Sequence, residues 1–192
     1  MFVIYNLFLF PIILISPLIV LIRIFLGKED QNRFKEKYGF FSKDSKPNET
    51  IWIHGASVGE ILSIIPIVMK FEEDKRIKRI LITSSTTSSS HILSKFKFKK
   101  AVHQFYPFDL NFLTKNFINH WKPKLAIFVD SEIWPNMFNN LHKKNIPLIL
   151  LNARITKKSF NRWKFFPNFS KKIFEKITLA LPQNMELSLI HI

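Results

Sequence analysis

The sequence predicts an α/β fold in which a parallel sheet carries helices on both faces, preceded by an N-terminal membrane-anchor helix. Three observations support this prediction. The first 22 residues contain no charged side chain. From residue 51 onward, short apolar runs typical of strands alternate with longer helical patterns, which is the order expected of a parallel sheet. Polar and charged residues directly follow the apolar runs, at the carboxyl ends of the expected strands.

The expected membrane anchor covers residues 1–26. Spanning the hydrocarbon core of a bilayer takes about 20 apolar residues, and the uncharged segment 1–22 is long enough. It lacks the basic start and the small-residue cleavage site of a signal peptide, so we expect it to be retained. Basic residues follow it, beginning with Arg23 and Lys28, and they predict that the rest of the chain lies on the cytoplasmic side. Two prolines leave open a kinked helix or one that enters a single leaflet, and a buried core helix is the other alternative.

A basic linker at residues 27–50 precedes the expected α/β domain at residues 51–186. Strands are expected at 51–54, 79–84, 101–105, 124–130, 147–152 and 177–181. Helices are expected at 61–73, 111–121, 137–144 and 159–176. Because open α/β sheets bind ligands outside the carboxyl ends of their strands, the loops after these strands should share one functional rim.

The composition limits the possible partners and cofactors. The 192 residues include 29 Lys and Arg against 14 Asp and Glu, a formal charge of +15, and no cysteine. Without cysteine there is no disulfide framework, thiolate metal site or cysteine nucleophile. The positive charge fits an anionic membrane surface, with a generally solvated basic surface as the alternative, and we expect no nucleic-acid partner. The six histidines show no metal-ligand spacing, so we expect no metal and no other cofactor.

The segment Ser57-Val58-Gly59-Glu60 follows the first expected strand and has two interpretations. It fits a capping box, in which Ser57 and Glu60 satisfy free amides at a helix start. Glu60 is equally placed to act as a general base that takes a proton from a substrate hydroxyl. Gly55 and Gly59 either let the backbone approach a ligand closely or serve only the turn. Residue patterns alone do not decide between these roles.

Two further rim segments carry candidate binding groups. The hydroxyl-rich residues 83–90 (TSSTTSSS), with Thr83 and Ser84 first, are suited to hydrogen bonding with phosphate or sugar, or to capping a helix. The segment DSEIWPN places Asp130 and Glu132 after an apolar strand, and a turn at residue 131 would aim the two carboxylates differently. Arg154 follows the next strand, where it can clamp a phosphate or carboxylate or form an ordinary surface ion pair.

Six segments, in their order and spacing, resemble the N-terminal half of bacterial 3-deoxy-D-manno-octulosonic acid (Kdo) transferase. They are RFKEKYGF, IWIHGASVGE, TSSTTSSS, YPFDL, DSEIWPN and NARITKKS. The resemblance implies a Rossmann-like acceptor-binding domain of an inverting, GT-B type glycosyltransferase with two such domains. It implies transfer of Kdo from CMP-Kdo to a lipid A precursor (lipid IVA) in lipopolysaccharide core biosynthesis, at the cytoplasmic face of the bacterial inner membrane.

The resemblance also implies residue roles. Glu60 corresponds to the glutamate that acts as base on the acceptor hydroxyl. Asp130 stands where the family usually has glutamate as the residue expected to stabilise the transition state, and it is one methylene shorter; Glu132 is kept. Ser89 occupies a position where the family usually has glycine. Substrate contacts are expected from six residues, Ser57, Gly59, Thr83, Ser84, Asn136 and Arg154.

The family pattern continues past residue 184 as a polar loop, a helix and a C-terminal donor-binding domain. Residues 187–192 (LSLIHI) depart from that pattern, and we expect a non-native truncated end, an absent donor domain and little or no activity of the chain alone. Two other functions stay open. One is that of a different two-domain glycosyltransferase, and the other is that of a non-enzymatic, membrane-anchored basic module that binds anionic lipid.

Overall fold

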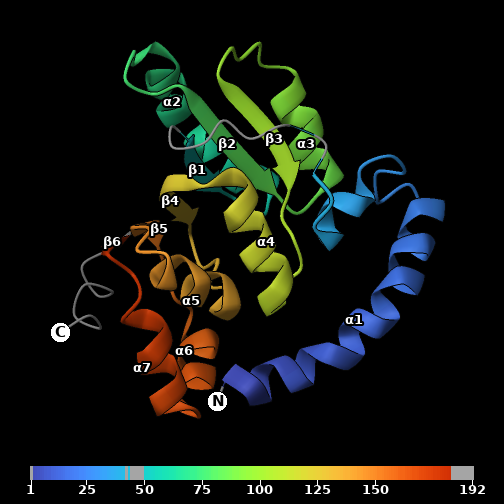
Figure 1. Ribbon diagram of the computed structural model, residues 1–192, viewed down its shortest axis with the longest axis vertical. Helices are drawn as coiled ribbons and strands as arrows, with labels where there is room; N and C mark the ends of the chain where they lie inside the picture. The colour runs from blue at the N-terminus through green and yellow to red at the C-terminus, as the bar shows by residue number, and fades with distance from the viewer. Residues whose placement is uncertain (1, 42, 44–49, 183–192) are drawn as a thin grey trace.

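The computed structural model describes residues 2–41, 43 and 50–182, and its centre is a sheet of six parallel strands (Figure 1). The strands lie in the order β3-β2-β1-β4-β5-β6. Their bounds are β1 Thr50–His54, β2 Arg79–Ser84, β3 Ala101–Phe105, β4 Pro123–Val129, β5 Leu148–Ala153 and β6 Leu179–Pro182. The chain starts in the middle of the sheet, builds outward to β3, and returns to the centre with β4. The strand order therefore reverses between β1 and β4, which is the point where doubly wound sheets bind ligands.

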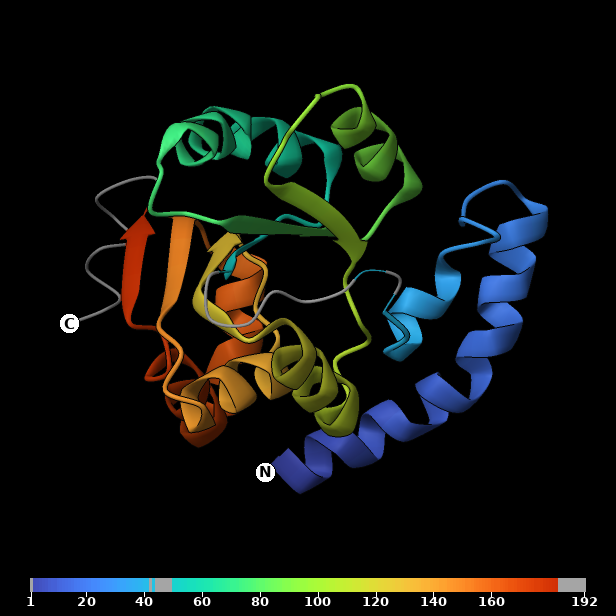
Figure 2. The same ribbon diagram turned by 45° about the horizontal axis from the view of Figure 1, so that its top comes forward.

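Helices cover both faces of the sheet (Figure 2). The helices α2 (Val58–Glu73) and α3 (Thr87–Ser94) lie on one face. The helices α4 (Asn111–Trp121), α5 (Pro135–Lys143) and α7 (Pro167–Phe174) lie on the other, with α6 (Lys157–Lys164) packed beside α7. The predicted fold class is thus confirmed.

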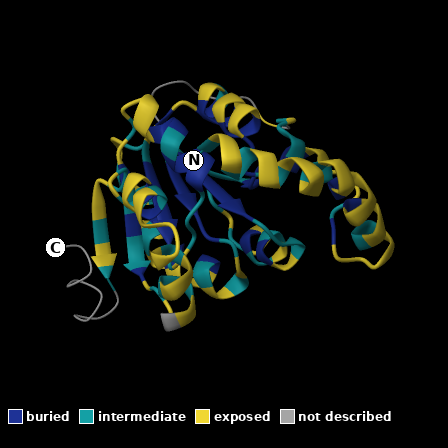
Figure 3. Cartoon of the chain, turned by 90° about the horizontal axis from the view of Figure 1, so that it is seen from below, coloured by how far each residue is buried: buried dark blue, intermediate teal, exposed yellow. Residues whose placement is uncertain are grey.

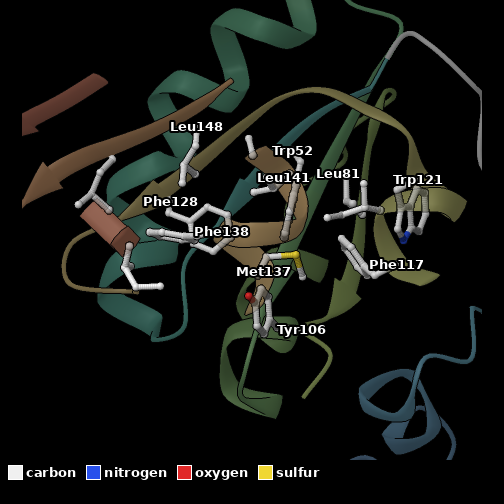
Figure 4. Packing of buried hydrophobic residues seen from close by; sticks show 14 of the residues in the cluster. Trp52, Leu81, Tyr106, Phe117, Trp121, Phe128, Met137, Phe138, Leu141 and Leu148 are labelled. Atoms are coloured by element: carbon white, nitrogen blue, oxygen red, sulfur yellow. The ribbon is translucent and has the colours of Figure 1, made fainter. Parts of the chain in front are cut away.

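The two faces have separate apolar cores because successive side chains of a strand point to opposite sides. On β1, Trp52 faces the α4–α5 side, where it packs with buried aromatic rings including Phe117 and Phe128 (Figure 4). Ile53 faces the other side, where it joins an aliphatic cluster that includes Ile61 of α2. Each fully buried large side chain contributes about 1.5–3 kcal/mol of transfer free energy. The strands that carry the rim are therefore rigidly held.

The expected strands agree with the structure to within two residues at either end, and the helix prediction fails in two places. The single helix expected at 159–176 is wrong, because α6 ends at Lys164 and Pro167 occupies the first turn of a separate helix, where its fixed φ is favourable. The helix α3 was not predicted as such: the serine-rich sequence is weakly helical, and the turn begins where the Thr86 side chain accepts a hydrogen bond from the Ser89 amide.

The N-terminal part consists of α1 (Phe2–Phe25) and the short 3-10 helix η1 (Phe34–Tyr38). By length and composition, α1 is apolar enough to cross a membrane. In the first part of the expected basic linker, two cations form ion pairs with carboxylates. Arg33 pairs with Glu36 at 2.8 Å, and Lys37, nearly buried, pairs with Glu29 at 2.8 Å. Residues 44–49, and the end of the chain at 187–192, lie outside the described residues.

Candidate functional site

The loops after β1, β4 and β5 form the centre of the rim, on either side of the strand-order reversal. The loop after β1 leads to α2 on one face of the sheet, and the loop after β4 leads to α5 on the other. The two loops therefore separate at their tips, and each contributes a predicted carboxylate. Glu60 lies in the first turn of α2, and Glu132 lies in the loop before α5.

The carboxylate of Glu60 is fixed by its own helix start. The Ser57 hydroxyl accepts a hydrogen bond from the Glu60 amide at 3.3 Å and donates one to Glu60 Oε1 at 2.7 Å. The Ala56 amide donates to Glu60 Oε2 at 2.8 Å. The predicted capping box is confirmed, and each oxygen is held by one donor. Since a carboxylate offers about four lone-pair positions, Glu60 retains acceptor capacity for a ligand hydroxyl, and its side chain is only half-buried.

The two glycines beside Glu60 differ in their surroundings. A Cβ added to Gly55 would lie 3.1 Å from Glu60 Cβ, so the absence of a side chain lets the start of α2 pack against the end of β1. A Cβ added to Gly59, which is exposed, would meet no protein atom within 4 Å. Gly55 therefore serves the turn, whereas Gly59 borders open space next to the carboxylate.

A buried hydrogen-bond chain supports Glu132 from inside the domain. The Trp52 indole donates to Thr83 Oγ1 at 2.8 Å, and Thr83 Oγ1 lies 2.9 Å from His54 Nδ1. The other ring nitrogen, His54 Nε2, lies 3.4 Å from Glu132 Oε2, which also accepts a 2.9 Å hydrogen bond from the Trp134 indole. With the Thr83 hydroxyl donating to Nδ1, the imidazole of His54 carries its proton on Nε2 and directs it at the Glu132 carboxylate. Each of the four side chains in this series then has a hydrogen-bond partner.

The hydroxyls of Thr83 and Ser84 thus lie inside the protein. Both residues are fully buried, and Ser84 Oγ lies 2.9 Å from Nε2 of His103. Burial lowers the pKa of His103 to about 3, and the positive charge of Arg33 acts in the same direction. The structure gives these hydroxyls internal partners, and their expected contact with a substrate stays a prediction.

Asp130 and Glu132 point to different neighbours, because the chain turns at residue 131. Asp130 has φ 60° and Asn152, at the end of β5, has φ 55°, a left-handed conformation that Asp and Asn tolerate better than most residues. The side-chain amide of Asn152 donates to Asp130 Oδ1, and the guanidinium group of Arg154 lies 3.2 Å from Asp130 Oδ2. Asp130 is therefore held from β5, and Glu132 is held from β1.

Asn136 is buried and connects three parts of the chain. Its backbone N–H donates to Asp109 Oδ2 at 3.0 Å, and its side-chain amide exchanges two hydrogen bonds with that of Asn6 in α1, at 2.9 and 3.2 Å. Asp109 also accepts from the Met137 amide and the Tyr5 hydroxyl, each at 2.9 Å. Burial raises the pKa of Asp109 to about 7, although these donors act in the opposite direction. The expected substrate contact of Asn136 stays a prediction beside this structural role.

Sequence reasoning places His54 and Asp109 at strand ends of the rim but assigns neither of them a supporting role. His54 was an isolated histidine without a ligand pattern, and Asp109 belonged to a short motif, YPFDL, without a role of its own. A signal was present in α1, where Tyr5 and Asn6 interrupt an apolar run and therefore need polar partners.

A cavity of about 810 Å³ adjoins the β5 side of the rim. It lies between β5, α6 and α7. Its lining combines apolar side chains such as Leu150 and Trp163 with charged residues, the cations Arg154, Lys164 and Lys171 and the anion Glu175. This mixture suits a ligand with both apolar and anionic parts. Within the described ranges, no group of three or more His, Cys, Asp or Glu could hold a metal ion.

Comparisons with known proteins agree on one family. The family model described as 3-deoxy-D-manno-octulosonic-acid transferase (Kdo transferase) matches residues 32–188. A 3-deoxy-D-manno-octulosonic acid transferase of Rickettsia bellii is 38% identical over 182 residues, covering 93% of this chain and 43% of the relative. The enzyme of the same name from Haemophilus influenzae is 32% identical over 155 residues, covering 80% of this chain and 36% of the relative. The chain therefore spans less than half the length of these relatives.

Solved structures support the fold. The UDP-GlcNAc 2-epimerase of Neisseria meningitidis, bound to UDP-GlcNAc, superposes with a TM-score of 0.53 at 11% identity, covering 74% of this chain and 44% of that one. At this identity the likeness concerns the fold alone. It agrees with a doubly wound domain of the kind found in two-domain, GT-B-like proteins.

Proposed function

The chain belongs to the Kdo transferase family, and on that premise we propose that it is the acceptor-binding half of an inverting glycosyltransferase. The reaction moves Kdo from CMP-Kdo to a hydroxyl of a lipid A precursor, lipid IVA, at the cytoplasmic face of the bacterial inner membrane. The donor-binding half belongs to the rest of the family's length, so the 192 residues alone show little or no transfer.

The carboxylate of Glu60 carries the proposal. It is half-buried, lies at the rim, and is oriented by two hydrogen-bond donors from Ser57 and Ala56. A base fixed in this way can accept the proton of an acceptor hydroxyl as the oxygen attacks the anomeric carbon of Kdo. The new glycosidic bond forms as the bond from that carbon to the CMP phosphate breaks, and attack opposite the leaving group inverts the configuration. Open space at Gly59 gives the acceptor room to approach.

Asp130, Glu132 and Arg154 take the electrostatic roles. The transition state resembles an oxocarbenium ion, so the carboxylates of Asp130 and Glu132 stabilise developing positive charge. Arg154, with 54% of its side chain exposed, is positioned to bind an anionic group of the substrates. Ser57 holds the base and borders the acceptor, whereas Thr83 and Ser84 act through the residues that they support.

The test uses the full-length gene product with CMP-Kdo and lipid IVA, and mass spectrometry of the lipid product. Glu60→Gln keeps an oxygen that accepts from the Ala56 amide but removes the base, so transfer should fall by about 10²–10⁴-fold with little loss of stability. Ser57→Ala is the matched variant for the capping role, because it removes the cap at a cost of about 1 kcal/mol. It also removes one of the two hydrogen bonds to the carboxylate but leaves the base itself, so transfer should fall less than in Glu60→Gln. Unchanged turnover in Glu60→Gln would reduce Glu60 to a capping residue and refute the assignment.

A further inference from the structure

One face of α1 is covered along its whole length. The covered or partly covered positions recur every three or four residues, and they are Phe2, Tyr5, Asn6, Leu9, Ile13, Ser16, Val20, Arg23 and Ile24. This spacing is that of a single helical stripe. The remaining positions are exposed and apolar from end to end, for example Val3 at 80%, Leu14 at 65% and Phe25 at 88% (Figure 3). The helix thus packs on the protein by one side and offers lipid-like surface on the other.

Polar contacts attach α1 to the domain at both ends and in the middle. Near its start, Tyr5 and Asn6 bind Asp109 and Asn136. In the middle, the Ser16 and Tyr38 hydroxyls lie 2.9 Å apart. Near its end, Arg23 pairs with Glu29 at 3.2 Å, and Glu29 in turn binds Lys37. A helix that crossed a bilayer at this position would carry the polar groups of the attached domain into the hydrocarbon.

The curvature of α1 agrees with a helix that wraps the domain (Figure 1). Pro11 and Pro17 both lie on the exposed side. Proline in a helix interior removes a hydrogen bond and bends the axis away from its ring, which places the rings on the convex side. The two prolines therefore favour the observed curve.

The neighbouring surface is aromatic and basic. Phe169 of α7 packs against Phe2 with ring centroids 5.4 Å apart, and the turn before α7 exposes Phe165 at 76% and Phe166 at 60%. Arg162, Lys164, Lys171 and Lys172 are exposed on α6 and α7, whose described side chains include no acidic residue. Glu175 directly follows α7. Exposed aromatic rings beside a helix, flanked by cations, fit the interface of a membrane that contains anionic lipid.

We infer that α1 lies in the plane of an anionic membrane, with its exposed face in one leaflet, and does not span it. The inference deepens the proposed function and rests on it for the link to the acceptor. The loops of the rim contact η1, which is connected to α1 through the ion pairs of Glu29 with Arg23 and Lys37. Lys37 Nζ donates to the Ser85 carbonyl at 3.2 Å, the Ser85 amide donates to the Ala56 carbonyl at 3.3 Å, and Ala56 holds Glu60. An in-plane α1 therefore brings the rim to the membrane surface, where a glycolipid hydroxyl would lie.

The experiment measures the depth of α1 in a bilayer. Since the chain has no cysteine, single cysteines at exposed positions 3, 7, 14, 18 and 25 carry one nitroxide label each without touching the packed face. The labelled 192-residue protein is reconstituted in vesicles of phosphatidylethanolamine and phosphatidylglycerol, and electron paramagnetic resonance gives the depth of each label. An in-plane helix should place all five labels within a few ångströms of one depth.

A spanning helix gives a different profile, because depth changes by about 1.5 Å per residue along its axis. The labels at 3 and 14 would then differ by roughly 16 Å, with the deepest label near the middle, and this result would overturn the inference. Labels in water at every position would show that α1 binds no membrane, which overturns it too. Neither outcome bears on the role of Glu60, since transfer to lipid IVA in detergent is measured separately. Vesicles of neutral phosphatidylcholine are the control, and weaker binding to them is expected.

Discussion

Replacing Thr83 with valine should destabilise the domain by about 2–4 kcal/mol, because the change removes one hydroxyl from the centre of a buried chain. Valine has nearly the shape of threonine, so no cavity opens. The Trp52 indole loses its acceptor, and leaving a buried donor unpaired costs about 1–3 kcal/mol. His54 Nδ1 loses its 2.9 Å partner but can still donate to the Thr83 carbonyl at 3.2 Å in its other tautomer. That tautomer removes the proton from Nε2 and with it the hydrogen bond to Glu132.

The matched control is Thr83→Ser, which keeps the hydroxyl and removes one methyl group, at a cost of about 1 kcal/mol. Urea unfolding of the 192-residue protein in one detergent, followed by tryptophan fluorescence, gives both free energies of unfolding. For a domain of this size the valine variant should melt roughly 4–16 °C lower. A valine variant as stable as the serine variant would show that the hydroxyl has no internal partners, and would return Thr83 to the substrate-binding role expected from sequence.

The glycines and the titrating groups give two further predictions. Gly59→Ala should keep or slightly raise the thermal stability, because alanine favours a helix by up to about 1 kcal/mol and its Cβ meets no protein atom. The same change should reduce transfer by the full-length enzyme. Gly55→Ala should lower both the thermal stability and the transfer, since its Cβ would crowd Glu60. His103 has a folded pKa of about 3, so its contribution to the free energy of unfolding is lost as pH falls from 6.5 to 3. Asp109 has a folded pKa of about 7, so its contribution is lost as pH rises from 3.8 to 7. The two slopes oppose each other in the wild type, so His103→Gln should show a free energy of unfolding that falls between about pH 4 and 7, and a flat or rising profile would contradict this account.

The parts of this structure that the sequence predicts are those governed by local physics. The strands of the sheet follow from short apolar runs, and the cap at Glu60 follows from the Ser-x-x-Glu spacing. Glu60 was also expected at the rim, because the loops after parallel strands share one edge of the sheet. Each of these expectations needs only neighbours within a few residues, or a topology that allows few alternatives.

The sequence does not predict in which direction a polar side chain at the end of a strand points. Thr83 lies near the end of β2 and Glu60 lies shortly after β1, but the Thr83 hydroxyl points to Trp52 and His54 inside the domain. The partners lie 29 and 31 residues away in the chain, so no local pattern contains them. The internal partners of the basic linker were not predictable for the same reason, since Arg33 donates a hydrogen bond to the backbone carbonyl of His103, 70 residues further along the chain.

The orientation of α1 relative to a membrane could not be predicted from the sequence either. A helix that is apolar on nearly all sides has no residue pattern that separates a spanning helix from an in-plane one. The inference of an in-plane helix rests on contacts between residues that are more than 100 positions apart in the sequence, such as that of Tyr5 with Asp109. Asp109 also accepts the first amides of α5, the helix that follows the Glu132 loop. The same carboxylate therefore holds both α1 and the start of the helix that follows the Glu132 loop. A change in the position of α1 on the domain would therefore alter the contacts of α5 through this residue. In the proposed in-plane arrangement, this connection makes α1 the element that sets the orientation of the rim to the bilayer.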